Sequence, residues 1–172
     1  ILIRSATKLT SDILADCNNL KVIGRAGVGV DNVDLDQATK NRILVMNTPL
    51  GNLEATAELS VGLMFSIMRN IHLANDSTHQ GKWEKPKFLG TELKGKTLGI
   101  VGYGNIGQRV AEICSTIGMK IITNSKSASD DELSKFDVKK VSTEDLIKES
   151  DIISLHTKLN DETKYMINKE TI

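Results

Sequence analysis

The stretch Lys96-Thr-Leu-Gly-Ile-Val-Gly-Tyr-Gly-Asn-Ile-Gly107 decides the fold of this chain. Its first half, Leu98 to Val101, is a short apolar run of the kind that is buried on both faces of a parallel sheet. Three glycines follow at G-x-G-x-x-G spacing: Gly102 permits a tight turn, Gly104 lets the main chain approach a ligand, and Gly107 lets a helix sit close on the strand. The stretch predicts a strand, a turn and a helix whose amino end binds a dinucleotide pyrophosphate.

The flanking segments strengthen this interpretation. Glycine spacing alone is a weak signal in a chain with 13 glycines, and a strand, turn and helix without any ligand is the alternative. The helix, however, is amphipathic, runs to about Ile117 and stops at Gly118, and a second apolar strand, Lys120 to Asn124, follows at once. A strand, a glycine turn, a helix and a second strand form the unit that binds dinucleotides.

Composition narrows the classes of protein. The 172 residues carry a formal net charge of zero and no block of Lys or Arg, so nothing marks a surface for nucleic acid. The apolar stretches are shorter than a membrane span, and the two cysteines, Cys17 and Cys114, have no metal-binding or redox spacing. We therefore predict a cytoplasmic protein with a small-molecule substrate, with reduced cysteines, and without a metal, nucleic-acid or membrane partner.

The two ends of the chain are unusual. The sequence opens at Ile1 inside an expected strand, without Met, and stops at Ile172 in mid-pattern. We expect a piece of a longer protein.

Strands and helices alternate before the glycine stretch. The sequence predicts strands at residues 1–4, 21–24 and 43–46 and a helix at residues 35–40. Such alternation of strands and helices favours a parallel sheet. Ligands bind at the carboxyl ends of such strands, where Arg4, Ser5 and the loop that begins at Arg25 fall. Gly27 and Gly29 in that loop would free N–H groups for an anion.

A turn rich in Pro, Gly and Asn at residues 47–52 precedes an expected long helix over 53–75. We expect its four-residue spacing of large aliphatic side chains to face the core, and Trp83 to anchor the connector that follows. The stripe consists of Leu59, Leu63, Ile67 and Ile71, with Met64 and Met68 alongside. The chain then continues with a weak strand at 138–141, a helix at 143–149 and a strand at 151–157.

Several motifs in this order resemble the NAD-dependent D-2-hydroxyacid dehydrogenases over essentially the whole chain. They are Arg4-Ser-Ala-Thr-Lys8, Gly24-Arg-Ala-Gly-Val-Gly-Val-Asp-Asn-Val-Asp34, Asn47-Thr-Pro49 with Ala57-Glu-Leu59, Gly81-Lys-Trp-Glu84, the run from Gly90 through the glycine stretch, and His156-Thr157.

The resemblance implies an α/β protein with part of a flavodoxin-like substrate domain, residues 1–48, and the first part of a Rossmann-type nucleotide domain, residues 49–172, around an active site in the cleft between them. It implies hydride transfer between 3-phospho-D-glycerate, or a similar D-2-hydroxyacid, and NAD, as in the first step of serine biosynthesis. A homo-oligomer, a dimer or tetramer, is also implied. The alternatives are a glyoxylate or hydroxypyruvate reductase, a non-catalytic dinucleotide-sensing protein and a methyltransferase-like adenosyl binder.

The resemblance also assigns residues. The substrate-binding set is Arg4, Ser5, Arg25, Gly27, Val28, Gly29 and Asn52. The cofactor-binding set is Val28, Gly102, Gly104, Asn105, Ile106, Gly107, Ser125 and Thr157. Solvated arginines at strand ends are the alternative for Arg4 and Arg25, and we interpret His156 as structural.

The chain departs from the family pattern at two points. Ser125, beside Lys126, stands where an acidic residue usually holds the ribose hydroxyls, so we hypothesise that the preference for NAD is relaxed and that NADP is possible. The family's catalytic arginine, glutamate and histidine match no position here. We therefore expect no catalytic residue within these 172 residues and no dehydrogenase activity from them alone.

Overall fold

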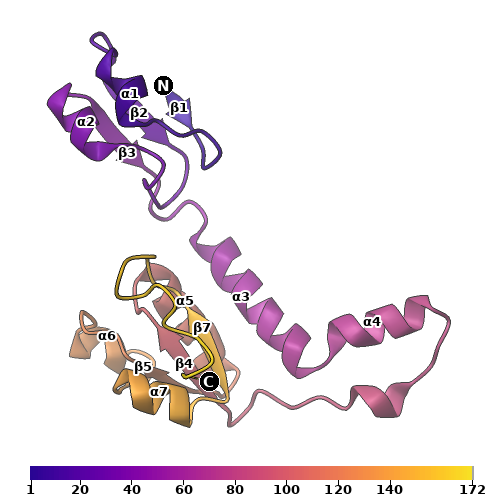
Figure 1. Cartoon of the computed structure of the whole chain (residues 1–172). Helices are drawn as coiled ribbons and strands as arrows, with labels where there is room; N and C mark the ends of the chain where they lie inside the picture. The colour runs from indigo at the N-terminus through magenta and orange to yellow at the C-terminus, as the bar shows by residue number, and fades with distance from the viewer. Residues whose placement is uncertain (172) are drawn as a thin grey trace. The chain divides into compact units, whose positions relative to one another are not determined.

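The computed structural model describes residues 1–171 of the chain, which forms two compact units, Ile1–Leu53 and Glu54–Ile172. Helices and strands alternate in the first unit and, from β4 onward, in the second, and every strand pairing among the described residues is parallel. The expected α/β architecture is confirmed (Figure 1).

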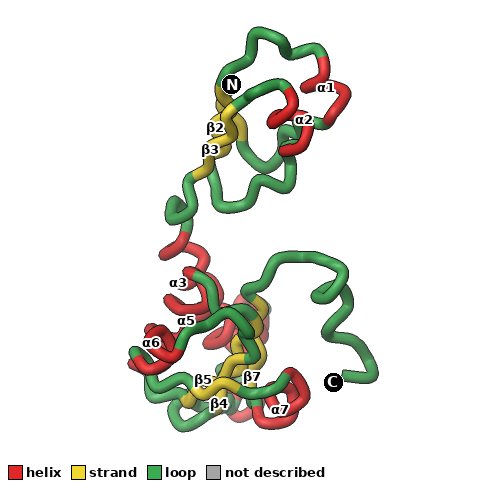
Figure 2. Tube along the Cα trace, turned by 90° about the vertical axis from the view of Figure 1, so that its left-hand side faces the viewer, coloured by secondary structure: helices red, strands yellow, loops and turns green. Residues whose placement is uncertain are grey.

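The first unit is a three-stranded sheet in the order β1-β2-β3, formed by β1 (Leu2–Ile3), β2 (Val22–Arg25) and β3 (Leu44–Asn47). The helices α1 (Ser11–Ala15) and α2 (Leu35–Lys40) lie on one face of the sheet, as Figure 2 shows. Leu14, Ile23 and Ala38 are almost fully buried beneath them. Because the three strands are parallel, the loops that follow them lie along a single edge of the sheet.

The second unit has a four-stranded sheet in the order β6-β5-β4-β7. Its strands are β4 (Thr97–Val101), β5 (Lys120–Thr123), β6 (Lys139–Lys140) and β7 (Ile152–Leu155). The central strand β4 is buried from Leu98 to Val101, which explains its uninterrupted apolar sequence. The strand order reverses between the neighbouring strands β4 and β7, and this reversal creates the crevice in which open α/β sheets bind ligands.

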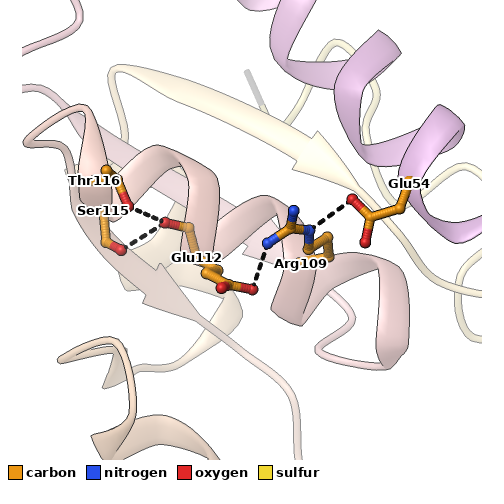
Figure 3. A network of polar contacts seen from close by, with 5 residues as sticks. All are labelled: Glu54, Arg109, Glu112, Ser115 and Thr116. Atoms are coloured by element: carbon orange, nitrogen blue, oxygen red, sulfur yellow. Dashed lines mark hydrogen bonds and ion pairs between the residues drawn. The ribbon is translucent and has the colours of Figure 1, made fainter.

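Helices cover both faces of this sheet. On one face, α3 (Leu53–Met68), α5 (Asn105–Thr116) and α6 (Asp130–Ser134) contribute to the larger core, and on the other α7 (Thr143–Glu149) buries Leu146 against Val101 and Ile122. Arg109 on α5 joins two of these helices: its side chain contacts Glu54 of α3 at 2.9 Å and Glu112 at 2.8 Å (Figure 3). Because these ion pairs are exposed to solvent, they contribute little to stability.

The long helix expected over residues 53–75 is in fact two helices. α3 ends at Met68 and α4 (Ile71–His79) begins after Asn70, whose φ of 53° places it in the left-handed region. Gly90 lies against this break, where a side chain would overlap the main chain of Met68 and Arg69. The break between α3 and α4 therefore coincides with the close approach of Gly90. The apolar periodicity of residues 53–75 contains no information about that contact.

The expected core stripe on α3 is wrong for its four aliphatic members, whereas Met64, expected beside them, is buried and Met68 packs against the core. Leu59, Leu63 and Ile67 are 64%, 54% and 65% exposed, and Ile71 at the start of α4 is exposed as well. Met64 shares the buried face with Ala57 and Val61, which were not expected there. Because α3 is apolar around most of its circumference, spacing alone could not choose between the two faces. Trp83, expected as an anchor, is 84% exposed.

Candidate functional site

The glycine loop, residues 102–107, joins the end of β4 to the start of α5. Gly104 is the residue before the helix, and the first intrahelical bond of the loop runs from the N–H of Gln108 to its carbonyl oxygen at 2.9 Å. The N–H groups of Asn105, Ile106 and Gly107 precede that bond and therefore have no partner within the helix. The helix dipole adds partial positive charge at the same place, which suits a phosphate.

The three glycines play different parts in this loop. Gly102 has a φ of 88°, and a side chain there would overlap the main chain of His156. A side chain on Gly107 would overlap the carbonyl oxygen of Gly102, so this glycine permits the close approach of α5 to the loop. Gly104 has no atom within 4 Å of the position that a Cβ would take. The space above Gly104 is thus open to a ligand, and the loop fits a dinucleotide pyrophosphate.

A cavity of about 700 Å³ lies over the glycine loop. It is lined by residues from three strand ends, among them Gly102, Gly104, Ser125, Thr157 and Lys158. Thr157 is therefore near the glycine loop in space although it is distant from it in sequence. Volumes of this size hold small organic ligands.

His156 lies beside this cavity, immediately after β7. Its main-chain N–H donates to Val101, and its Nε2 lies 2.8 Å from the hydroxyl of Ser154. Burial lowers the pKa of the imidazole below its ordinary value, which keeps the ring neutral.

The serine loop, residues 124–129, closes the other side of the cavity. The N–H of Ser125 donates to the Thr123 hydroxyl at 3.3 Å, and the Ser125 and Ser127 hydroxyls lie 3.4 Å apart. Lys140, from the adjacent strand β6, donates through Nζ to the main-chain oxygen of Lys126 at 3.1 Å. The loop thus presents hydroxyl groups beside two ammonium groups.

In the first unit, the candidate substrate residues follow the strands of the three-stranded sheet. Arg4 and Ser5 follow β1 and are exposed, Arg25 ends β2 and is half-buried, and Asn52 is exposed before α3. Because all three strands are parallel, Arg4 and Arg25 lie at the same edge.

The loop after Arg25 differs in one respect from the expected anion nest. The N–H of Gly27 already donates to the Thr48 hydroxyl at 2.8 Å, and the Asp31 carboxylate lies beside Gly29. Within residues 1–171, the structure shows no hydrogen bond from the main-chain N–H groups of Val28 and Gly29, so these two groups could bind an anion. Positive charge at this loop therefore comes chiefly from the Arg25 side chain, which lies across Gly27.

Sequence reasoning missed the residues that hold these loops. Thr48 fixes Gly27, Lys140 supports the serine loop, and Gln108 bridges the Tyr103 carbonyl at 3.2 Å and Glu132 at 2.9 Å. Thr48 stands at a strand end and could have been suspected from that position. Gln108 and Lys140 could not be recognised from the sequence, because the contacts with Glu132 and Lys126 join different elements.

Parallel strands, a reversal of strand order and a glycine loop at a helix amino end define a Rossmann-type dinucleotide-binding unit. The comparison with known families agrees: the model for the NAD binding domain of D-isomer specific 2-hydroxyacid dehydrogenase matches residues 61–172. The chain belongs to the D-2-hydroxyacid dehydrogenase family, and its second unit corresponds to the family's NAD-binding domain.

Relatives and solved structures support this assignment. A hydroxypyruvate reductase of Thermotoga maritima is 46% identical over all 172 residues, which cover 55% of its length. A D-3-phosphoglycerate dehydrogenase of Bacillus subtilis is 43% identical over the same residues, which cover 33% of its length. The crystal structure of D-lactate dehydrogenase from Aquifex aeolicus, complexed with NAD and lactic acid, matches 99% of this chain with a TM-score of 0.89 and 33% identity, over 51% of its own chain. The chain thus spans between a third and about half of these relatives.

No helix in the described part of the chain has both the length and the apolar character required to cross a membrane.

Proposed function

We propose that the full-length protein containing this chain oxidises 3-phospho-D-glycerate, or a similar D-2-hydroxyacid, with NAD, as in the first step of serine biosynthesis. The observation that carries the proposal is the glycine loop at the amino end of α5, open above Gly104, in a chain that also presents Arg4 and Arg25 at one sheet edge. Bound NAD supplies the acceptor for the hydride that leaves C2 of the substrate.

The residues of this chain would bind and orient the two reactants. The N–H groups of Asn105, Ile106 and Gly107 would hold the pyrophosphate. Ser125 would lie at the ribose hydroxyls, and Thr157 beside the adenosine and nicotinamide side of the cofactor. Arg4 with Ser5 and the loop of Arg25 to Gly29 would hold the carboxylate or phosphate of the substrate, because guanidinium groups pair with such anions through two hydrogen bonds. We assign substrate binding to residues 1–48, with Asn52 in the turn that follows, and cofactor binding mainly to residues 49–172, with Val28 contributing from the substrate side.

The test is a substrate panel assayed with the full-length protein. We expect NAD-dependent oxidation of 3-phospho-D-glycerate with a kcat/KM at least about 10-fold above that for D-glycerate, because one charge-assisted phosphate contact is worth more than about 1.4 kcal/mol. Saturable NADH binding without turnover of any 2-hydroxyacid would instead favour a dinucleotide-sensing protein.

Hydroxypyruvate or glyoxylate reduction is the second candidate. The Thermotoga maritima relative bears the name hydroxypyruvate reductase and is as similar to this chain as the phosphoglycerate dehydrogenases are. A kcat/KM for hydroxypyruvate that exceeds the value for its 3-phosphate ester would favour this candidate.

We also propose that the protein accepts NADP beside NAD. Ser125 stands where the family usually has a carboxylate, which would repel the 2′-phosphate of NADP. Lys126 and Lys140 add positive charge to the serine loop, whereas Glu162 adds a negative charge to the lining of the cavity. A preference for NAD over NADP above about 100-fold in kcat/KM, equivalent to about 2.7 kcal/mol, would contradict this proposal.

Two further properties of the full-length protein are proposals by resemblance: a homo-oligomer, either dimer or tetramer, and a cytoplasmic location. Light scattering coupled to size exclusion would give the oligomeric state.

A further inference from the structure

Asn32 is a buried polar residue between two strand-end loops. Its side chain is 9% exposed, and it belongs neither to the glycine motif nor to the residues assigned to substrate binding. The loop that follows β1 we call the Arg4 loop, residues 4–10, and the loop that follows β2 the Arg25 loop, residues 26–34. Asn32 belongs to the second and contacts the first.

The amide of Asn32 is saturated by these contacts. Its Nδ2 donates to the carbonyl oxygen of Arg4 at 3.0 Å and to that of Thr7 at 2.6 Å. The main-chain carbonyl oxygen of Asn32 accepts from the N–H of Leu9 at 2.8 Å. The two loops are therefore joined at three points by one residue, and the turn from Arg4 to Thr7 is held at both ends.

These bonds determine where the side-chain oxygen of Asn32 points. Since both amide hydrogens are directed at carbonyl oxygens, the opposite orientation would place oxygen against oxygen, and the amide is held in one orientation. The Oδ1 atom then accepts from Nε of Arg25 at 3.5 Å. Asn32 thus fixes the main chain of Arg4 and also directs the guanidinium of Arg25.

We propose that Asn32 is a positioning residue that sets the separation and direction of Arg4 and Arg25 for binding the anionic group of the substrate, a carboxylate or a phosphate. The inference rests on the proposed function, since it takes Arg4 and Arg25 as the anion-binding pair. Asn32 is too buried to reach the substrate itself and acts through its neighbours. A fold-stabilising role alone is the competing account.

Asn41 provides a matched control in the same unit. Its Nδ2 also donates to two main-chain oxygens, those of Leu14 at 2.5 Å and Ala15 at 3.4 Å, so Asn41→Ala removes bonds of the same kind. Those bonds join the end of α1 to the end of α2, just before β2 and β3, at the opposite edge of the sheet from Arg4 and Arg25.

The experiment compares Asn32→Ala, Asn32→Asp and Asn41→Ala in the full-length protein, with NADH and either hydroxypyruvate or its 3-phosphate ester. For both Asn32 variants we expect KM to rise about 10-fold or more, since displaced binding groups lose affinity steeply, while the Kd for NADH stays within about twofold. Asn32→Asp keeps the shape but places a carboxylate against two carbonyl oxygens, and should be at least as impaired as Asn32→Ala. Asn41→Ala should lower stability without changing KM.

The results of this experiment distinguish a positioning role of Asn32 from a purely fold-stabilising role. An unchanged KM in the Asn32 variants, with a loss of stability like that of Asn41→Ala, would overturn the proposal and leave a fold-stabilising residue. If Asn32→Ala does not fold, Asn32→Ser keeps a donor for one of the two carbonyls, and its KM decides in the same way. A wild-type protein that binds NADH but reduces neither compound would refute the proposed function itself, and this inference with it.

Discussion

Tyr103 carries a hydroxyl that has no hydrogen-bond partner among the described residues, although its side chain is only 4% exposed. Burial, together with the nearby charge of Glu132, raises the pKa of this phenol above its ordinary value, so the group stays neutral. An unsatisfied buried hydroxyl costs free energy, whereas the ring itself packs in the larger core.

Tyr103→Phe should therefore stabilise the second unit by about 1 kcal/mol, since the unpaired group disappears and the ring remains. Native-state hydrogen exchange of the β4 amides measures the change in opening free energy. Tyr165→Phe, at a side chain that is 78% exposed, is the control and should have no effect. A loss of stability in Tyr103→Phe would indicate that the hydroxyl has a partner in solution.

The lowered pKa of His156 predicts that the stability of the second unit depends on pH. Because burial lowers the pKa of its imidazole in the folded state, the unfolded chain takes up a proton first as the pH falls through the ordinary histidine range. Stability contributed by this residue is thus present above that range and is lost as the pH decreases. His156→Gln should reduce the difference in opening free energy between pH 7.5 and pH 5.5, while His79→Gln, on exposed α4, should retain it. Equal pH dependence in His156→Gln and wild type would show that other groups account for it.

Residue types at strand ends were more informative than residue spacing within helices. The glycine loop was predicted with its helix and its open site because steric limits at Gly102 and Gly107 allow almost no other residue. Asn32 and Thr48 were not predicted, since an amide or hydroxyl in a loop acquires its role only from partners more than 20 residues away. The sequence places such residues at the right edge but does not show their contacts.

At the level of elements, the packing of α7 on β4 depends on a glycine in the strand, Gly99. Gly99 lies on β4 where a Cβ would be 2.8 Å from Cδ2 of Leu146 and would overlap the Ser150 hydroxyl. Gly62, in α3, is exposed and has no atom within 4 Å of the position of a Cβ.

Gly99→Ala should destabilise the second unit by about 1–3 kcal/mol, the usual cost of overpacking a core. Gly62→Ala should stabilise it by about 1 kcal/mol, because alanine is the better helix former. Hydrogen exchange at the β4 amides reports both changes. Opposite signs are the expected result, and equal signs would contradict the packing described here.

Helix α3 shows that the periodicity of apolar residues does not by itself predict which helix face is buried. The apolar spacing in α3 fits the exposed set of Leu59, Leu63 and Ile67 as well as the buried set of Ala57, Val61 and Met64. The four large aliphatic side chains suggested the wrong face, and of the expected stripe only Met64 is buried.

On the scale of the whole molecule, the two units have separate hydrophobic cores. Leu14 belongs to the core of the first unit and Val110 to the larger core of the second, and both side chains are fully buried. No buried core residue is shared between these clusters within residues 1–171.

Leu14→Ala should therefore lower the protection of the β2 amides by about 2–5 kcal/mol and leave both β4 and the Kd for NADH nearly unchanged. Val110→Ala, which removes two methyl groups, should cost about 1–3 kcal/mol at β4 and leave β2 unaffected. Hydrogen exchange with and without NADH checks both variants in the full-length protein. Loss of β4 protection in Leu14→Ala would mean that the units unfold cooperatively.

The position of β4 between β5 and β7 has a consequence for biosynthesis. Leu98 pairs with Ile152, about fifty residues further along the chain, so one edge of β4 stays open while those residues are still being added. At roughly 5–20 residues per second, this interval lasts about 3–10 s on the ribosome. During it, an apolar strand with unpaired main-chain groups is available to chaperones and to neighbouring nascent chains.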